Sequence, residues 1–238
     1  MNEARKELAS NGKLRVGLNY GNFLLVLKDA PDGAPRGIAP DLGRELGRRL
    51  GVPVEFVKFA QAGQLADAVR DGSCDVGFLG AEPQRAAEIA FTKAYLEIPV
   101  TFLVPAGSPI RRIAEVDREG VRVAVSARSA YDLYLSRALK HAKLVRAEGI
   151  DGSYELFIRE RLDVLAGLKP RLVSDAEKLP GSHVLEGQVT GVQQAVGVSR
   201  DRENAAQFTR EFVDEIKRSG LVAKIIEKYG VKGVTVAP

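Results

Sequence analysis

The sequence holds few of the residue types that carry catalysis or bind metals. Its 238 residues include one cysteine, two histidines and no tryptophan. A single cysteine excludes an internal disulfide, and without paired Cys and His motifs no zinc site is indicated. Neither His141 nor His183 has a serine or cysteine partner at a spacing that indicates a catalytic triad. Cys74 precedes a predicted strand, where we expect a small buried residue rather than a nucleophile. We therefore expect no catalytic residue, no metal and no cofactor.

Long apolar runs and blocks of like charge are missing as well. No apolar run approaches the ~20 residues that a membrane-spanning helix needs. The 35 Lys and Arg residues and the 31 Asp and Glu residues are interspersed and leave a net charge of +4. The densest basic cluster, Arg44, Arg48 and Arg49, is typical of a solvated helix face. We expect no nucleic-acid partner.

The beginning of the chain is polar. Met1 to Arg5 lead directly into polar sequence, without the apolar region of a signal peptide. Such a start is expected either of a cytoplasmic protein or of the mature form of an exported one. The length allows a sizeable core, in one large domain or in two small lobes.

The hydrophobic pattern that is present is typical of an α/β fold. Apolar residues alternate or run together in predicted strands, and they recur at helical spacing in the segments between. The predicted strands are residues 13–19, 52–59 and 74–79, and the predicted helices are 41–50 and 64–70. This β-α-β-α-β order predicts a parallel sheet with helices on both faces.

The same pattern occurs a second time. Residues 121–125 resemble residues 14–18, and residues 162–171 resemble residues 74–85. In the second pair, Asp-Val stands at the entrance of each strand, and Pro and Arg follow its exit. We interpret this repetition as two lobes of similar build.

Two extended apolar segments are predicted to join the lobes. Residues 95–105 lead out of the first lobe and residues 190–199 lead back, before two helices at 202–218 and 221–229. We expect lobe one to comprise 1–101 and 195–238, and lobe two 102–194. The ligand cleft is expected at the carboxyl ends of both sheets, where α/β folds bind ligands.

An ordered set of short strings carries a resemblance to a known family. They are Gly12–Gly17, Gly37–Leu42, Glu82–Ala86, Ile89–Tyr95, Ser219–Leu221 and Lys228–Gly230. In this order they resemble the bacterial extracellular solute-binding proteins of the polar amino-acid type, family 3, the periplasmic receptors of ABC importers. The resemblance implies a two-lobed type II periplasmic-binding-protein fold, with parallel-sheet lobes joined by two crossing strands that close over a small solute. It also implies a monomer, a periplasmic location and a membrane permease as partner.

The resemblance assigns Arg85 to the solute's carboxylate. In the family, an arginine closes a string like Glu82-Pro83-Gln84-Arg85 and binds the α-carboxylate. A guanidinium suits this task because its planar fork donates two parallel hydrogen bonds. The alternative is a surface arginine at the start of a helix.

A loop in the second lobe is the other expected anion site. Ser126, Ser129 and Ala130 stand where a strand ends and a helix begins, so backbone N–H groups there favour an anion. The family usually has glycine where this chain has Arg128. That arginine either adds positive charge to the cleft or points outward.

Further candidates lie at strand ends of the first lobe. They are Asn19, Tyr20 and Asn22 after the first strand and Phe59 after the second, and each of these fits a turn or core role equally well. Gly80 stands at the exit of the third strand, where relatives usually have Ser or Thr contacts. Relatives often hold the solute's ammonium with an aspartate where this chain has Leu168. We therefore expect a carboxylate with an apolar body and no α-amino group, unless Glu82 supplies the missing anion.

The alternative function is an enzyme on the same fold, such as a cyclohexadienyl dehydratase. That chemistry needs a general acid after the second-lobe strand. Residues 168–171 read Leu-Lys-Pro-Arg and contain no carboxylate, and Glu82 or Glu160 would replace it without a supporting motif. A sensor domain of this fold is a third alternative, which needs an attached signalling segment. We expect a binding protein that is not an enzyme.

Overall fold

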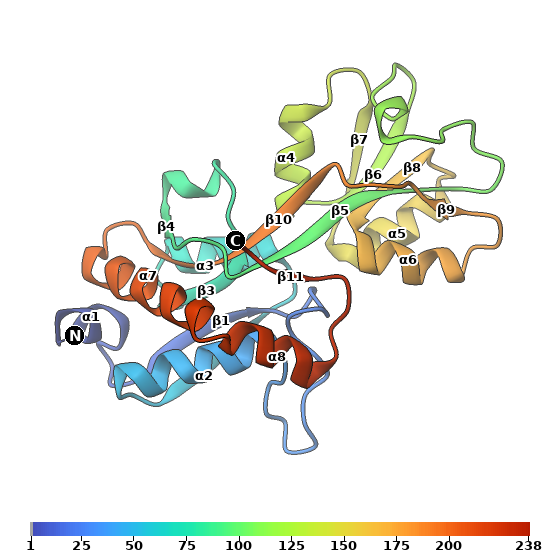
Figure 1. Cartoon of the computed structure of the whole chain (residues 1–238). Coiled ribbons are helices and arrows are strands. Elements are labelled where there is room, and N and C mark those ends of the chain that lie inside the picture. Colours follow the sequence, from blue (N-terminus) through green and yellow to red (C-terminus); the bar gives the residue numbers. More distant parts are fainter. Residues whose placement is uncertain (1) are drawn as a thin grey trace. The chain divides into compact units, whose positions relative to one another are not determined.

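The computed structural model describes residues 2–238, and the chain divides into two compact units (Figure 1). Unit 1 comprises the residues up to Glu97, Gln193–Val231 and Thr235–Pro238. Unit 2 comprises Ile98–Val192 and Lys232–Val234. Within the described part of the chain, no helix has the length and apolar character to cross a membrane.

The sheet of unit 1 contains the predicted parallel strands. Strand β1 (Leu14–Asn19) lies between β2 (Val54–Phe59) and β3 (Val76–Gly80) and is parallel to both. Strand β10 (Thr190–Ser199) pairs with β3 in the antiparallel sense, and β4 (Ile89–Phe91) pairs with β10. The predicted β-α-β-α-β order is therefore confirmed.

Helix α2 (Ile38–Leu50) has the buried apolar face and the glycine at its C-terminal end that its sequence predicts. Leu42, Leu46 and Leu50 are buried, and Gly51 ends the helix in the left-handed conformation, with φ of 71°. A residue with a Cβ is strained there. On the outer face, Arg48 and Arg49 each lie 2.7 Å from a carboxylate oxygen of Glu45. The predicted solvated face is confirmed for Arg44 and Arg48, which are exposed, but not for Arg49, which is mostly buried and also pairs with Glu215 at 2.7 Å.

The other helices of unit 1 are α1 (Asn2–Leu8), α3 (Ala62–Arg70), the 3₁₀ helix η1 (Arg85–Ala87), α7 (Glu203–Arg218) and α8 (Leu221–Tyr229). Helix α1 was not predicted. It packs on α7, where a carboxylate oxygen of Glu7 accepts the N–H of Ala205 at 2.8 Å. This contact caps the beginning of α7 and depends on residues that are distant in sequence. The short strand β11 (Thr235–Val236) pairs with the first residues of β5.

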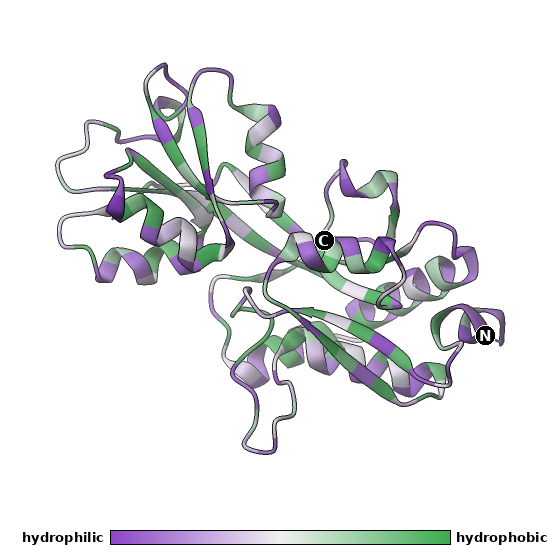
Figure 2. Ribbon diagram, turned by 180° about the vertical axis from the view of Figure 1, so that it is seen from behind, coloured by the Kyte–Doolittle hydropathy of each residue, from purple (hydrophilic) through white to green (hydrophobic). Residues whose placement is uncertain are grey.

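Unit 2 repeats the parallel arrangement around β6. Strand β6 (Arg122–Ser126) lies between β7 (Lys143–Ala147) and β8 (Val164–Leu168) and is parallel to both. Strand β5 (Leu96–Val104) pairs with β8 and with β9 (His183–Val184) in the antiparallel sense. The helices are the 3₁₀ helix η2 (Ile113–Glu115), α4 (Ala130–Ala138), α5 (Gly149–Arg159) and α6 (Lys169–Glu177). Figure 2 shows hydrophobic residues concentrated along the strands of each unit.

One arginine–aspartate contact occurs at equivalent places in both units. In unit 1, the backbone N and Nε of Arg15 donate to Asp75 Oδ2 at 2.9 and 3.1 Å. In unit 2, the same two atoms of Arg122 donate to Asp163 Oδ2 at 2.9 and 3.3 Å. Each contact ties the first residues of a central strand to the entrance of its neighbour. The predicted similarity of build thus extends to individual hydrogen bonds.

A residue in the turn before each aspartate, two positions after the preceding helix, also has a repeated role. Nη2 of Arg15 donates to the carbonyl of Gly72 at 2.8 Å, and Nη2 of Arg122 donates to the carbonyl of Arg161 at 2.7 Å. Gly72 and Arg161 both have left-handed backbones, with φ of 71° and 47°. Unit 2 therefore places an arginine where unit 1 has a glycine.

Candidate functional site

The carboxyl ends of three parallel strands meet at one edge of unit 1. Asn19 at the end of β1 pairs with Phe59 at the end of β2, and Gly80 ends β3. We call this the carboxyl edge of unit 1. It is the kind of edge at which α/β sheets bind ligands.

Asn19 and Asn22 shape the turn that follows β1. Asn19 Oδ1 accepts the N–H of Gly21 at 3.1 Å, and its backbone carbonyl accepts the N–H of Asn22 at 3.1 Å. Asn22 is buried, and its Oδ1 accepts the N–H of Leu24 at 3.2 Å. Such short-range bonds to asparagine are typical of turns, so the side-chain oxygens of both residues are used locally.

Tyr20 is also held within unit 1. Its hydroxyl donates to Asp29 Oδ1 at 2.8 Å, and Lys58 Nζ lies 4.9 Å from the centre of its ring. Partial burial and the bond to Asp29 raise the pKa of the Tyr20 hydroxyl. Phe59 packs against the hydrophobic cluster under α3, with its side chain partly buried. These contacts give both aromatic residues a structural role at the edge.

Arg85 is the most unusual of the predicted site residues because its charge is buried. It begins η1, and the residue is 7% exposed. The backbone carbonyl of Glu82 accepts the N–H groups of Arg85 and Ala86 at 2.9 and 3.0 Å, which forms the turn. Arg85 Nη1 donates to the carbonyl of Gly80 at 2.7 Å. A surface arginine at a helix start, the alternative reading, is therefore wrong. The guanidinium is fixed at the end of β3.

In unit 2 the carboxyl ends of β6 and β8 form a second edge, which we call the carboxyl edge of unit 2. Ser126 ends β6 and is buried, and Ser129 is the N-cap of α4. Ser129 Oγ accepts the N–H of Asp132 at 3.0 Å, as capping serines do. Ala130 is the first residue of α4 and is buried. An N-terminus of this kind attracts anions through free N–H groups and the helix dipole.

Arg128 joins β6 to α4 with a strained backbone. Its φ is 57°, a conformation that costs an L-residue roughly 1 kcal/mol and suits glycine. This explains physically the glycine that the resembled family usually has here. The N–H of Arg128 donates to Asp132 Oδ2 at 2.8 Å, and Asp132 Oδ1 also pairs with Arg146 Nε at 2.9 Å. Buried Asp132 thus fixes the loop.

Tyr131 is a polar residue at this edge that the sequence analysis missed. The residue is 3% exposed, and its hydroxyl oxygen is buried with no well-formed hydrogen bond. Burial raises the pKa of this hydroxyl to about 12, although the nearby hydroxyls of Ser129 and Ser126 lower it. Leaving such a group unpaired costs about 1–3 kcal/mol. The only feature of the sequence that could have indicated this role is the position of Tyr131, which is the second residue of a helix that begins after the capping residue Ser129.

Leu168 brings no polar group to the edge. It is buried at the end of β8, and α6 begins at the next residue without a capping side chain. Pro170, in the first turn of α6, has no N–H to donate. The exit of β8 therefore offers an ammonium group no carboxylate.

Metal ligands, the cysteine and the histidines are the remaining groups that could carry chemistry. Residues 2–238 contain no group of three or more His, Cys, Asp and Glu side chains arranged to hold a metal. Cys74 is buried as predicted, and burial raises the pKa of its thiol to about 12. His141 is exposed in the loop after α4, and His183 is half-buried in β9.

Both edges therefore offer groups that attract an anion. Unit 1 contributes a buried guanidinium, and unit 2 contributes a capped helix N-terminus with serine and tyrosine hydroxyls beside it. A carboxylate is the ordinary ligand of either arrangement.

Comparisons with known proteins place this geometry in a family. The model described as bacterial extracellular solute-binding proteins, family 3, matches residues 14–232. Among solved structures, the solute receptors for L-cysteine of Neisseria gonorrhoeae give a TM-score of 0.80 at 20% identity, covering 97% of this chain and 95% of that one. A mutant of ArgBP from T. maritima gives 0.78 at 24% identity, covering 95% and 99%. An ancestral amino acid-binding protein, a precursor of cyclohexadienyl dehydratase, gives 0.76 at 21% identity, covering 94% and 98%. The predicted type II periplasmic-binding-protein fold is thus confirmed.

Proposed function

Because this chain belongs to the bacterial extracellular solute-binding proteins, family 3, we propose that it is the solute receptor of an ABC importer. Its solute carries a carboxylate. Proteins of similar fold are described as receptors for L-cysteine and as an ancestral arginine-binding protein bound to arginine, which supports an amino acid or a related organic acid. The receptor acts in the periplasm as a monomer and delivers its solute to a membrane permease.

The observation that carries this proposal is the burial of Arg85. Arg85 is 7% exposed as a residue, and its Nη1 donates to the Gly80 carbonyl at 2.7 Å, so the side chain is oriented before a ligand arrives. An oriented donor in a place with little water binds a carboxylate more strongly than a mobile surface arginine does. Arg85 is therefore the proposed main contact of the carboxylate.

The N-terminus of α4 is the proposed second contact. The chain passes between the units in β5 and β10, and we place the hinge in these strands. The solute first binds Arg85, and hinge closure then adds Ser126, Ser129 and the N–H groups of α4. Contacts made only in the closed state shift the population toward it.

We further propose that, of these two classes, the solute is the organic acid without an α-amino group, and that the protein is not an enzyme. Leu168 and Pro170 leave the exit of β8 without an ammonium acceptor and without a general acid. A buried ammonium without a partner is costly. Binding measurements on pairs of analogues with and without the amino group test the first point. Incubation with prephenate followed by chromatography tests the second.

A thermal-shift screen tests the receptor proposal. The panel is the proteinogenic amino acids, their deaminated analogues and small organic acids that include prephenate. A ligand at about 100 times its Kd adds about 2.7 kcal/mol of stability, which raises Tm by several degrees. We expect at least one carboxylate to do so, and Arg85→Ala to weaken its binding by about 100-fold or more.

Arg70→Ala is the matched control for this substitution. Arg70 is also an arginine of unit 1, but it is exposed and pairs with Asp67 and Asp71. It should bind the solute as the wild type does. A solute whose affinity survives Arg85→Ala contradicts the proposed role of Arg85, and turnover of prephenate contradicts the proposal that the protein only binds.

A further inference from the structure

Unit 2 contains a cavity at the end of its sheet opposite to the carboxyl edge. Its volume is about 370 Å³. Pro105, which follows β5, and Leu162, which precedes β8, both line it. Because β5 and β8 are antiparallel, these two positions lie together at the amino end of β8. Ser126 and Leu168 lie at the other end of their strands, so this cavity is separate from the carboxyl edge of unit 2.

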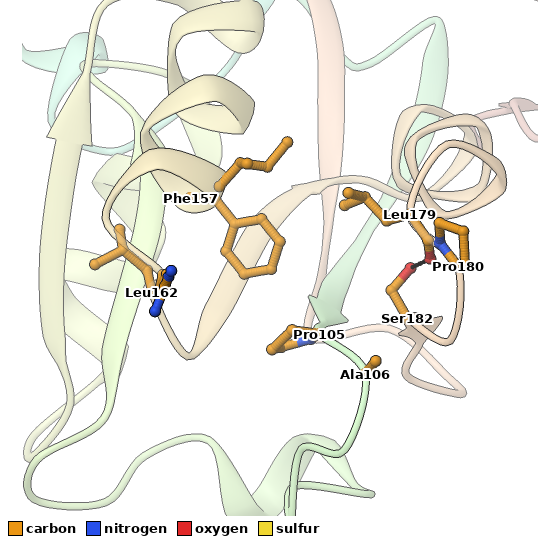
Figure 3. A pocket seen from close by; sticks show the side chains of 9 residues that line it. Pro105, Ala106, Phe157, Leu162, Leu179, Pro180 and Ser182 are labelled. Atoms are coloured by element: carbon orange, nitrogen blue, oxygen red, sulfur yellow. Dashed lines mark hydrogen bonds between the residues drawn. The ribbon is translucent and has the colours of Figure 1, made fainter.

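The wall of this cavity is almost wholly apolar. In Figure 3 the ring of Phe157 lies between Leu162 on one side and Leu179 and Pro180 on the other, with Pro105 below. Ile158 also lines the cavity and is 44% exposed, so a large apolar side chain remains open to solvent beside it. Water has few polar partners there. The volume lies in the range of small-molecule sites, which are mostly apolar with a few placed polar groups.

Arg161 supplies the one charge among the residues that line this cavity. Its backbone is left-handed, with φ of 47°, and its carbonyl is held by Nη2 of Arg122 at 2.7 Å. Gly72 of unit 1 likewise stands two residues after a helix, and glycine adopts this conformation without strain. Within residues 2–238, the Arg161 guanidinium has neither a carboxylate nor a carbonyl partner. Arg161 is exposed, so its guanidinium is open to a ligand that enters from solvent, and a strained residue beside an apolar cavity points to such a ligand.

We propose that this cavity binds an amphipathic organic anion, with its apolar body against Phe157, Leu162 and Leu179 and its carboxylate on Arg161. A medium-chain fatty acid has this chemistry. The apolar part fits a wall that offers it no polar group, and the guanidinium fork pairs with the carboxylate. The site is independent of Arg85 and of the solute proposed above.

Isothermal titration with sodium octanoate tests this site, and octanamide serves as the neutral analogue of the same length. We expect wild type to bind octanoate, and Arg161→Gln to weaken binding by about 10- to 100-fold. Octanamide should bind wild type about as weakly as octanoate binds the variant. Arg161→Gly is a second variant that removes the charge and suits the local backbone.

Arg159→Gln is the matched control. Arg159 pairs with exposed Glu160 at 3.3 Å and does not line the cavity. This variant and Arg85→Ala should bind octanoate like wild type, and octanoate should shift the amide NMR signals of residues 157–162. The proposal is overturned if wild type does not bind octanoate, if the Arg161 variants bind it unchanged, or if octanamide binds equally well. Loss of binding in Arg85→Ala, with the Arg161 variants unaffected, would assign octanoate to the solute site instead.

Discussion

Burial determines the properties of the residues that matter most in this protein. Arg85 is held where little water reaches it, and Tyr131 has a buried hydroxyl without a well-formed hydrogen bond. Both groups lose hydration on folding, and a carboxylate or hydroxyl bound beside either one would add a hydrogen bond to it. Arg85 could be identified from the sequence because it is the last residue of the motif Glu82-Pro83-Gln84-Arg85, which resembles a motif of the family. The sequence did not identify Tyr131, since position 131 in the first turn of a helix does not by itself show that the tyrosine hydroxyl is buried without a hydrogen bond.

Burial also predicts that Cys74 is chemically inert in the folded protein. Burial is the largest cause that raises the pKa of its thiol to about 12, so at pH 8 about one thiol in ten thousand is ionised. We expect iodoacetamide at pH 8 to leave Cys74 unmodified in the native protein and to alkylate it fully in guanidinium chloride. Mass spectrometry reads out the result, and rapid alkylation of the native protein would contradict it.

Because the backbone at Arg161 is strained, an Arg→Gly substitution there and the same substitution at Arg159 should change the free energy of unfolding in opposite directions. Arg161→Gly removes a left-handed L-residue and should raise the free energy of unfolding by about 0.5–1 kcal/mol. Arg159→Gly, in the last turn of α5, should lower it by about 0.5–1 kcal/mol, because glycine is a poor helix former. Urea denaturation measures both. Destabilisation by Arg161→Gly would show that its side chain contributes more than its backbone costs.

At the scale of single elements, one substitution at the N-cap of helix α4 is expected to weaken solute binding while leaving the stability of the protein nearly unchanged. Aspartate is as good an N-cap as serine, so Ser129→Asp should keep the free energy of unfolding within about 1 kcal/mol. Its negative charge should repel a carboxylate and weaken solute binding by more than about tenfold. Ser129→Thr should preserve both properties. A Ser129→Asp variant that binds the carboxylate normally would contradict the role of this helix N-terminus.

Helix α2 predicts a pH dependence of stability. The hydrogen bond from Arg48 is the largest cause that lowers the pKa of Glu45 from 4.5 to about 2, against the opposing effect of burial. Because the folded pKa is the lower one, the stabilisation is present above pH 4.5 and is lost as pH falls toward 2.

Glu45→Gln should therefore destabilise by about 1 kcal/mol at pH 6 and by progressively less toward pH 2. Glu177→Gln, an exposed helix carboxylate without an ion pair in the described part of the chain, should have little effect at either pH. Urea titrations at several pH values test this. A Glu45→Gln effect that is the same at pH 6 and pH 2.5 would contradict the assignment.

How closely the sequence predicts an element depends on how regular its pattern of apolar residues is. Helix α2 has a strong apolar periodicity and a glycine stop, and β3 is a continuous apolar run, so both were predicted closely. Strand β7 and helix α5 were missed because charged and polar residues interrupt their patterns. Helix α6 was also missed, because it begins directly after β8 and no capping residue marks its beginning in the sequence.

At the scale of the whole molecule, the two units have a similar build, and each contains a different candidate anion-binding group. The repeated Arg15–Asp75 and Arg122–Asp163 contacts tie each central strand to its neighbour. The groups at the opposite ends of these strands have diverged, into a buried arginine in unit 1 and a capped helix N-terminus in unit 2. The repetition could be read from the sequence. The hydrogen bonds that orient Arg85 and the α4 loop could not, because they depend on turn geometry.

The central claim is that this protein recognises its solute through a carboxylate. Calorimetric titration of wild type with the best carboxylate of the thermal-shift screen, and with its primary amide, tests it most directly. Removing one negative charge while keeping size and shape should lower the affinity about 10- to 100-fold, because charge-assisted bonds to Arg85 and the α4 N-terminus become neutral ones. Equal affinity for acid and amide would contradict the account.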